Sequence, residues 1–151
     1  MAFKRFEEIK AWQEGRELVK AVYALTRLGD FAKDWGLKDQ LQRAAVSIAS
    51  NIAEGYARRG NKEFAKFLWI AKGSAAEVQS QLYHAKDLHY ISDPEFESLY
   101  NQANLIQVHI YHLIESLSSS PDYQKIPTLR TPPTPPTPLN PPTPLNLPNN
   151  L

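Results

Sequence analysis

The chain has 151 residues, of which 42% are hydrophobic and 22% are charged, a composition typical of a single globular domain. It contains no cysteine, which excludes disulfide bonds, thiolate metal ligands and cysteine nucleophiles. No apolar run approaches the ~20 residues that span a bilayer, and the N-terminus lacks the apolar segment of a secretory signal, so we expect a cytoplasmic protein with no membrane partner.

The formal net charge of +1 is unevenly distributed along the chain. Residues 36–86 hold eight Lys/Arg and four Asp/Glu, whereas residues 87–120 hold five Asp/Glu and no Lys or Arg. The basic middle segment favours an anionic partner. On its own, a charge of this size is explained more simply by an ordinary solvated face.

The first predicted helix covers residues 6–28, where apolar side chains recur at helical spacing: Ile9, Trp12, Val19 and Tyr23. Gly29 suits the residue after the helix, because glycine adopts the left-handed conformation without a Cβ clash. We then expect Asp30 to cap a second helix that runs to about Tyr56 and becomes regular after Gly36.

Two longer apolar seams follow. Gly60 and Asn61 are expected to end one helix and begin a third, whose seam alternates spacings of 4 and 3: Phe64, Leu68, Ala71, Ala75, Val78, Leu82 and Ala85. Asp93 and Pro94 predict the start of a fourth helix, as a capping carboxylate followed by proline at the first helical position. Its seam has the same spacing: Leu99, Ala103, Ile106, Ile110, Leu113 and Leu117.

Heptad seams of this kind predict near-parallel helix axes, and the short connections imply antiparallel neighbours. The predicted fold class is therefore all-α, an antiparallel up-down-up-down four-helix bundle over residues 1–120.

Residues 121–151 are predicted to form a disordered tail rich in Pro, Thr and Asn. Nine of the twelve prolines follow Thr131, and the hexapeptide PPTPLN occurs twice in tandem. Proline favours polyproline II and removes backbone donors, so this segment has no core of its own. The spacing of its prolines suits a partner with aromatic grooves. A neutral, repeat-derived extension is the simpler interpretation.

The second helix also carries a polar stripe: Arg43, Ser47, Asn51 and Glu54. Catalysis, ligand binding and helix packing are the candidate roles. Small residues crowd the same helix and the next one, including Ala44, Ala53, Gly73 and Ser74, and small side chains let two backbones approach closely. A buried hydrogen bond contributes only ~1 kcal/mol, but an unpaired partner costs ~1–3 kcal/mol, so the stripe would fix register. We favour this packing role.

Residues 36–82 strongly resemble the four-helix bundle proteins of the 23S ribosomal RNA intervening-sequence family. The resemblance extends from about Phe6 to Leu117, and its most specific part is the run Ser50-Asn51-Ile52-Ala53-Glu54-Gly55. Further matching elements are Gly36-Leu37, Gln40-Leu41, Arg43-Ala44, Ser47-Ile48, Phe67-Leu68 and Gly73-Ser74, together with Trp12-Gln13 in the first helix.

This resemblance implies a homo-oligomer, specifically a pentameric barrel of bundles. Relatives of the family include the accessory variability determinants of diversity-generating retroelements, which look like basic pentamers that bind nucleic acid and a reverse transcriptase. The resemblance therefore suggests three kinds of partner: further copies of this chain, RNA or DNA, and a reverse transcriptase.

The fourth helix has more apolar residues than one seam needs: Leu105, Val108, Tyr111 and Ile114. A core-facing helix uses about one apolar stripe. We expect the surplus to form a subunit interface, the alternative being a wide core face with scattered exposed residues.

The candidate binding residues cluster around the connection between the second and third helices: Arg58, Arg59, Lys62, Lys66, Trp69 and Lys72. Arginine and lysine can contact phosphates, and an exposed aromatic ring can stack on an unpaired base. The alternative is a capped, solvated turn in which Trp69 is partly packed.

No metal, cofactor or catalytic centre is predicted. His109, His112 and Glu115 share one helix but lack the Glu-x-x-His pairs of a bundle metal site, so we interpret them as surface or interface residues. There is no phosphate-binding glycine loop. The sequence thus predicts a non-enzymatic homo-oligomer that binds RNA or DNA through the basic turn. The alternative is a protein-interaction scaffold, such as a reverse-transcriptase accessory subunit without direct nucleic-acid contact.

Overall fold

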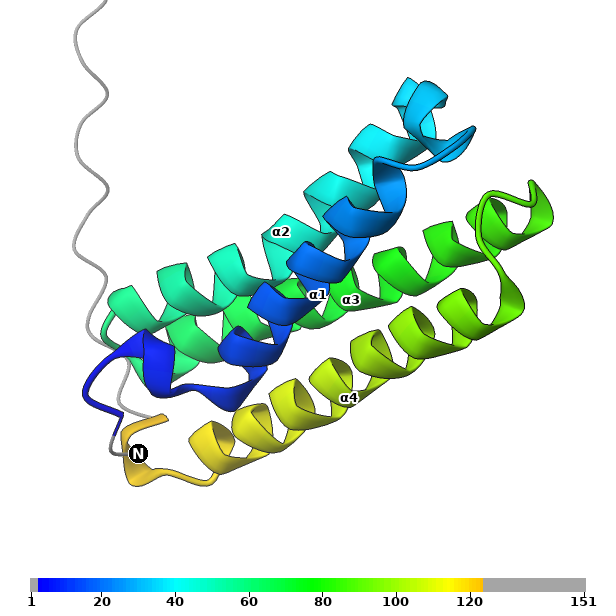
Figure 1. Ribbon diagram of the computed structural model, residues 1–151. Helices are drawn as coiled ribbons and strands as arrows, with labels where there is room; N and C mark the ends of the chain where they lie inside the picture. Colours follow the sequence, from blue (N-terminus) through cyan, green and yellow to red (C-terminus); the bar gives the residue numbers. More distant parts are fainter. Residues whose placement is uncertain (1–2, 124–151) are drawn as a thin grey trace, which may run out of the picture.

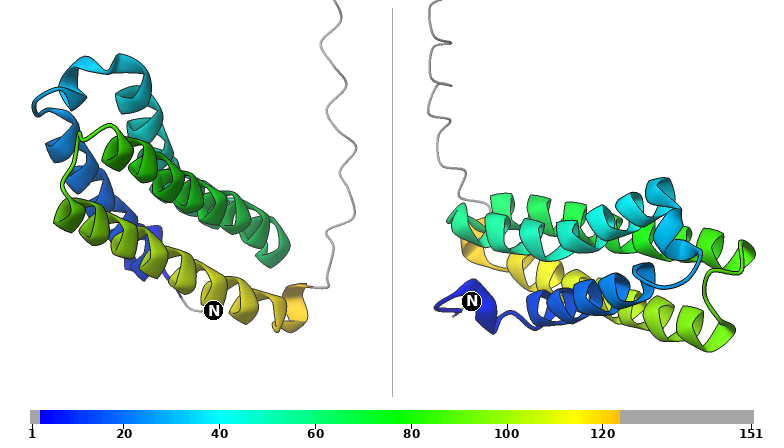
Figure 2. Two further views of the ribbon diagram at one scale, coloured as in Figure 1. Left: turned by 90° about the vertical axis from the view of Figure 1, so that its right-hand side faces the viewer. Right: turned by 45° about the horizontal axis from the view of Figure 1, so that its top comes forward.

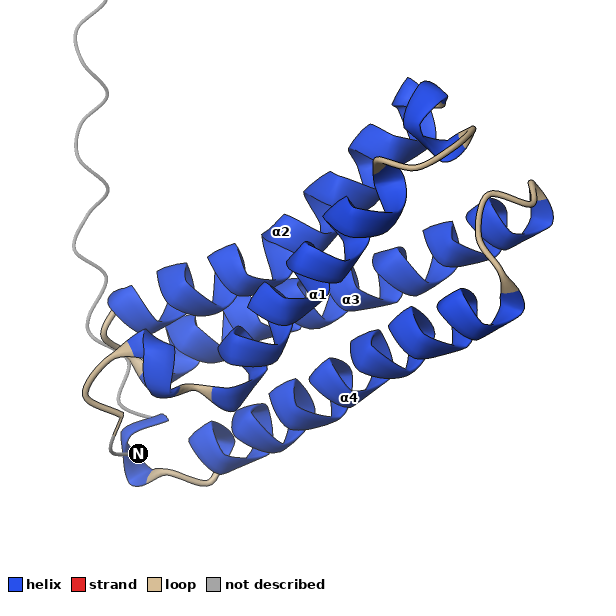
Figure 3. Cartoon of the chain, viewed as in Figure 1, coloured by secondary structure: helices blue, strands red, loops and turns tan. Residues whose placement is uncertain are grey.

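The computed structural model describes residues 3–123, so most of the predicted tail, residues 124–151, lies outside the described residues. The described chain forms four α-helices joined by turns and short 3₁₀ helices (Figure 3). The helices are α1 (Lys10–Thr26), α2 (Trp35–Ala57), α3 (Asn61–Asp87) and α4 (Asp93–Ser118). The 3₁₀ helices are η1 (Phe6–Glu8), η2 (Phe31–Lys33) and η3 (Pro121–Tyr123). The all-α prediction is confirmed.

Consecutive helices run in opposite directions along one bundle (Figure 1). The register of the contacts gives the same result. Ser47 of α2 bonds to Ser74 of α3, whereas Gln40, earlier in α2, bonds to Gln81, later in α3. The α1–α2 and α3–α4 connections therefore lie at one end of the bundle, and the α2–α3 turn lies at the other end with the N-terminus and η3 (Figure 2).

The core follows the predicted seams closely. All seven seam residues of α3 are buried, as are five of the six in α4. The exception is Leu113, which is only partly buried, because Ile114 takes its place in the core with 5% exposure. The assignment of Ile114 to a surplus outer face was therefore wrong.

The helix ends differ from the predictions at the caps. The first helix is not continuous from residue 6, because Ile9 is extended between η1 and α1. Asp30 does not cap α2: the chain first forms η2, and Asp34 then accepts a bond from the Leu37 amide at 3.1 Å. At α4 the cap is Ser92 rather than Asp93, in a capping box with Glu95.

The boundary between the bundle and the predicted tail also differs from the prediction. Pro121–Tyr123, assigned to the tail, form η3, and Tyr123 packs against the core. Within residues 3–123, no helix combines the length and apolarity needed to cross a membrane.

Gly55 allows α2 and α3 to converge at their shared turn. A Cβ atom at Gly55 would lie 2.6 Å from Phe67 Cβ and 3.0 Å from Phe64 Cδ2. The Phe67 Cβ is attached directly to the α3 backbone, so it cannot move aside without moving the helix. The absence of a side chain at Gly55 is therefore required by the packing of α2 on α3.

We predict that Gly55→Ala destabilises the bundle by about 1–3 kcal/mol, because the added methyl group overpacks the α2–α3 contact. Gly73→Ala is the matched control: Gly73 is also inside a helix, but a Cβ there meets nothing within 4 Å. It should instead stabilise the protein by about 0.5–1 kcal/mol, through better helix propensity. Urea unfolding of both variants measures the difference, and equal effects would contradict this account of Gly55.

Candidate functional site

The α2–α3 turn connects two long helices through residues 58–60. Arg58 is the C-cap residue of α2, and its guanidinium bonds to Glu54 at 2.8 Å and lies 5.2 Å from the Phe67 ring centroid. The charge of Arg58 is thus partly neutralised by Glu54. The other predicted cations of the turn have no such partner at ion-pair distance within residues 3–123.

The left-handed residue that ends α2 is Arg59, one residue before the glycine predicted for this position. Arg59 is left-handed with φ of 54°, whereas Gly60 is extended and serves as the N-cap of α3 without a side-chain bond. The prediction that Gly60 ends the helix and Asn61 caps the next was therefore wrong by one residue. Arg59 is exposed in this turn.

Lys62 and Lys66 continue the basic surface along α3. Both are exposed, and neither they nor Arg59 forms an ion pair with another residue of the range 3–123. The spacing of four residues places Lys62 and Lys66 on one helix face, and Glu63 between them forms no ion pair with either lysine. This surface can therefore accept an anion without first breaking a salt bridge.

Trp69 lies one turn further along this face and is 50% exposed. Its ring meets Tyr111 of α4 edge to face, with 6.4 Å between centroids, and the Lys72 ammonium is 5.8 Å from the ring centroid. Lys72 itself is half-buried. The structure thus brings all six predicted residues to the turn and the first half of α3, and it adds Tyr111 to them.

Tyr111 belongs to an outer face of α4 that has few charges. Residues 98–114 contain no Asp, Glu, Lys or Arg. Leu105, Val108 and Tyr111 on this helix are 48%, 41% and 43% exposed. The hydrogen bond to Glu115 raises the pKa of the Tyr111 phenol. The result is an apolar, uncharged strip next to the basic surface.

The polar stripe divides into two parts: Ser47 and Asn51 form hydrogen bonds at the α2–α3 contact, whereas Arg43 and Glu54 are exposed. Ser47 Oγ is 2.9 Å from Ser74 Oγ, and the Asn51 amide donates to both the carbonyl and the hydroxyl oxygen of Ser47. Arg43 and Glu54 instead pair within α2, with Asp39 and Arg58. Spacing alone could not identify Ser74 as the partner, because the pairing depends on the register of α3 against α2.

The histidines of α4 have separate environments. His109 Nδ1 lies 2.7 Å from Glu14 Oε2 and so links α4 to α1, whereas His112 is exposed. No group of three His, Asp or Glu residues within the described range could hold a metal ion.

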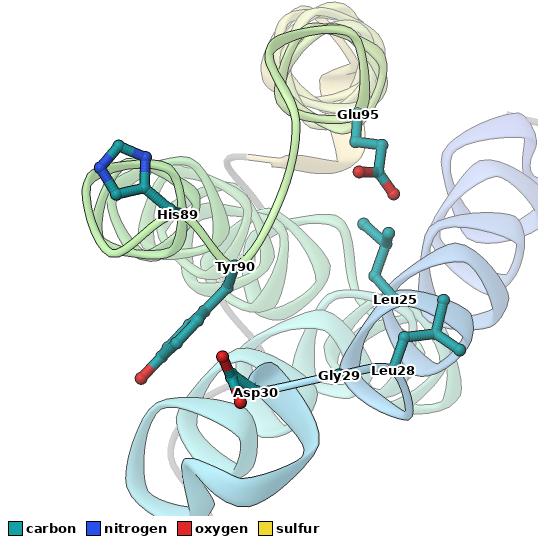
Figure 4. A pocket seen from close by; sticks show the side chains of 7 residues that line it. All are labelled: Leu25, Leu28, Gly29, Asp30, His89, Tyr90 and Glu95. Carbon is teal, nitrogen blue, oxygen red and sulfur yellow. The ribbon is translucent and has the colours of Figure 1, made fainter.

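A groove of about 250 Å³ lies at the opposite end of the bundle, lined by Leu25, Leu28, Gly29, Asp30, His89, Tyr90 and Glu95. The carboxyl groups of Asp30 and Glu95 face this space from two sides (Figure 4). Ligand pockets usually enclose ~300–1,000 Å³, and Glu95 is already engaged in the α4 capping box. This negatively charged groove is unsuited to an anionic ligand.

Comparison with known proteins defines the class of this bundle. The family described as 23S rRNA-intervening sequence protein matches residues 7–112, so the chain belongs to that family. A similar fold occurs in a protein of unknown function from the S23 ribosomal protein family of Bacteroides thetaiotaomicron. The two chains share 24% identity with a TM-score of 0.64, covering 70% of this chain and 98% of the other. No curated protein matches the chain by sequence.

We predict that Ser47 and Ser74 are energetically coupled. Ser47→Ala should cost about 1 kcal/mol, because it leaves the 93%-buried Ser74 and the Asn51 amide with fewer partners. Replacing both serines should cost less than the sum of the single changes. Urea unfolding in a double-mutant cycle measures this coupling. Ser80→Ala, on the exposed face of α3, is the control, and strict additivity would argue against the packing role.

Proposed function

We propose that this protein is a non-enzymatic homo-oligomer that binds RNA or DNA through the α2–α3 turn and the adjoining face of α3. The observation that carries the proposal is the setting of Trp69: a half-exposed indole with Lys66 before it, Lys72 beside it and the unpaired Arg59 and Lys62 at the turn. Phosphate contacts and base stacking need these two kinds of group within reach of one another.

The chemistry supports binding rather than catalysis. The site combines cations that can neutralise phosphates with an aromatic surface, and it has no adjacent nucleophile and base. Its affinity would come largely from counterion release, and therefore depend strongly on salt. Repetition of the turn around an oligomer would multiply the phosphate contacts of one nucleic-acid chain.

Self-association is supported by the outer face of α4. Leu105 and Val108 lie exposed on a helix whose residues 98–114 carry no charged side chain, and charge depletion with exposed apolar groups is the surface composition of subunit interfaces. The family resemblance suggests a pentamer. Cytoplasmic localisation is part of the same proposal, because a cytoplasmic protein has access to RNA.

The same α4 face supports a second candidate function. It would serve equally well as the docking surface of a protein partner such as a reverse transcriptase, with the bundle acting as a scaffold and making no contact with nucleic acid. The two functions differ in whether the turn cations or the α4 face are essential, and the following two variants separate them.

Reversing Arg58, Arg59 and Lys62 to Glu should abolish nucleic-acid binding, because phosphate attraction becomes repulsion, while the oligomer stays intact. Fluorescence anisotropy with structured RNA and duplex DNA, at low and physiological salt, measures the affinity. The control is a variant with the same change in net charge, made by replacing three exposed residues on α1 and its C-terminal connection with Glu: Lys20, Arg27 and Lys33. This variant should retain binding. Unchanged affinity in the turn variant, or none in the unmodified protein at low salt, would favour the scaffold.

Val108→Glu should dissociate the oligomer without unfolding the bundle, because it places a charge in the apolar α4 strip. Val46→Glu is a close control, since Val46 on α2 has the same exposure, 41%, and lies outside that strip. Sedimentation velocity gives the oligomeric state and circular dichroism the helix content. If Val108→Glu leaves the assembly unchanged, α4 is not the subunit interface.

A further inference from the structure

Trp69 and the lysines before it form one continuous line on α3. Lys62, Lys66 and Trp69 follow each other at spacings of four and three residues, which places them along about 10 Å of one helix face. Tyr111 meets the indole in an edge-to-face arrangement and the Lys72 ammonium lies over the ring, yet half of Trp69 remains exposed. A chain of phosphates lying over the two ammonium groups would therefore pass directly beside an open aromatic surface.

The two kinds of nucleic acid can use this line differently. A duplex presents its phosphates at the surface but keeps its bases stacked inside, so it would reach the lysines and leave the indole unused. To stack on Trp69, a paired base must leave the helix, which costs free energy. A single strand offers phosphates and unpaired bases together, without that cost.

We propose that single-stranded nucleic acid is the ligand of this site, with its backbone along Lys62 and Lys66 and an unpaired base stacked on Trp69. This inference rests on the proposed nucleic-acid binding and specifies its substrate class. Lys72 fits the arrangement, because its ammonium lies 5.8 Å from the ring centroid, where it can bind the phosphate next to the stacked base.

The other exposed tryptophan has an aromatic ring with one lysine but no line of lysines beside it. Trp35 is 75% exposed, and the Lys38 ammonium lies 3.7 Å from its ring centroid. The residues three and seven positions before it are Ala32 and Leu28, so it lacks the preceding lysines that Trp69 has, and it lies at the end of the bundle away from the turn. Trp35 therefore provides a control within the same molecule.

The test is fluorescence anisotropy of the full chain with labelled oligothymidylate, oligouridylate and a duplex of equal length. We expect the single strands to bind more tightly than the duplex. Trp69→Ala should weaken single-strand binding at least about fivefold, the lower end of the effect of losing one stacked base, and leave duplex affinity unchanged. Trp69→Phe should retain most of the affinity, and Trp35→Ala all of it.

The outcomes separate this inference from the proposed function. The single-strand inference is overturned if Trp69→Ala has no more effect on affinity than Trp35→Ala, or if the duplex binds as tightly as the single strands. In either case the proposed nucleic-acid binding stands, provided that the turn reversal weakens the affinity for all probes. If no probe binds at low salt, both fail.

A second measurement does not depend on deleting Trp69. The chain has three tryptophans, so a variant with Trp12 and Trp35 replaced by Phe reports Trp69 alone. A base stacked on the indole should quench its fluorescence as oligothymidylate is added, with the midpoint seen by anisotropy. Saturated binding without quenching would overturn the stacking arrangement.

Discussion

The close approach of α2 and α3 determines much of the geometry of this bundle. Gly55 leaves room for the α3 backbone beside Phe67, and the Ser47–Ser74 hydrogen bond fixes one helix against the other two turns away. With the two helices held so near, the connection between them is only residues 58–60. A turn this short cannot bury long cationic side chains, so Arg59 and the first lysine of α3 project into solvent.

The helices and their seams could be predicted because apolar spacing reports burial directly. The caps could not, because several suitable residues compete within a few positions and tertiary contacts decide between them. Asp34 accepts a bond from the Tyr90 hydroxyl at 3.0 Å, and Phe31 stacks on the same ring, so the chain before α2 is drawn toward the α3–α4 connection. The carboxylate that caps α2 is thus the one that also reaches Tyr90.

The exchange of Leu113 for Ile114 has a different cause. A straight α-helix has 3.6 residues per turn, so a strict seven-residue seam drifts by about 20° per heptad relative to the core. A seam that drifts in this way can shift locally, and the core of α4 runs through Ile106, Ile110 and Ile114 before it returns to the predicted seam at Leu117. For the candidate site, local spacing was enough to group the cations with Trp69. The contact with Tyr111 depends on the α3–α4 register, which no single-helix pattern contains.

Arg59 occupies the left-handed position of the turn, where glycine would cause the least backbone strain. A left-handed residue with a Cβ carries backbone strain of roughly 1–2 kcal/mol, while the glycine next to it is in an extended conformation that any residue adopts. Exchanging the two residue types would relax the backbone and move the cation by one place. Stability favours glycine at residue 59, whereas the present charge placement requires arginine there. Selection of variants for heat resistance alone would therefore favour a more stable turn whose positive charge lies at another position.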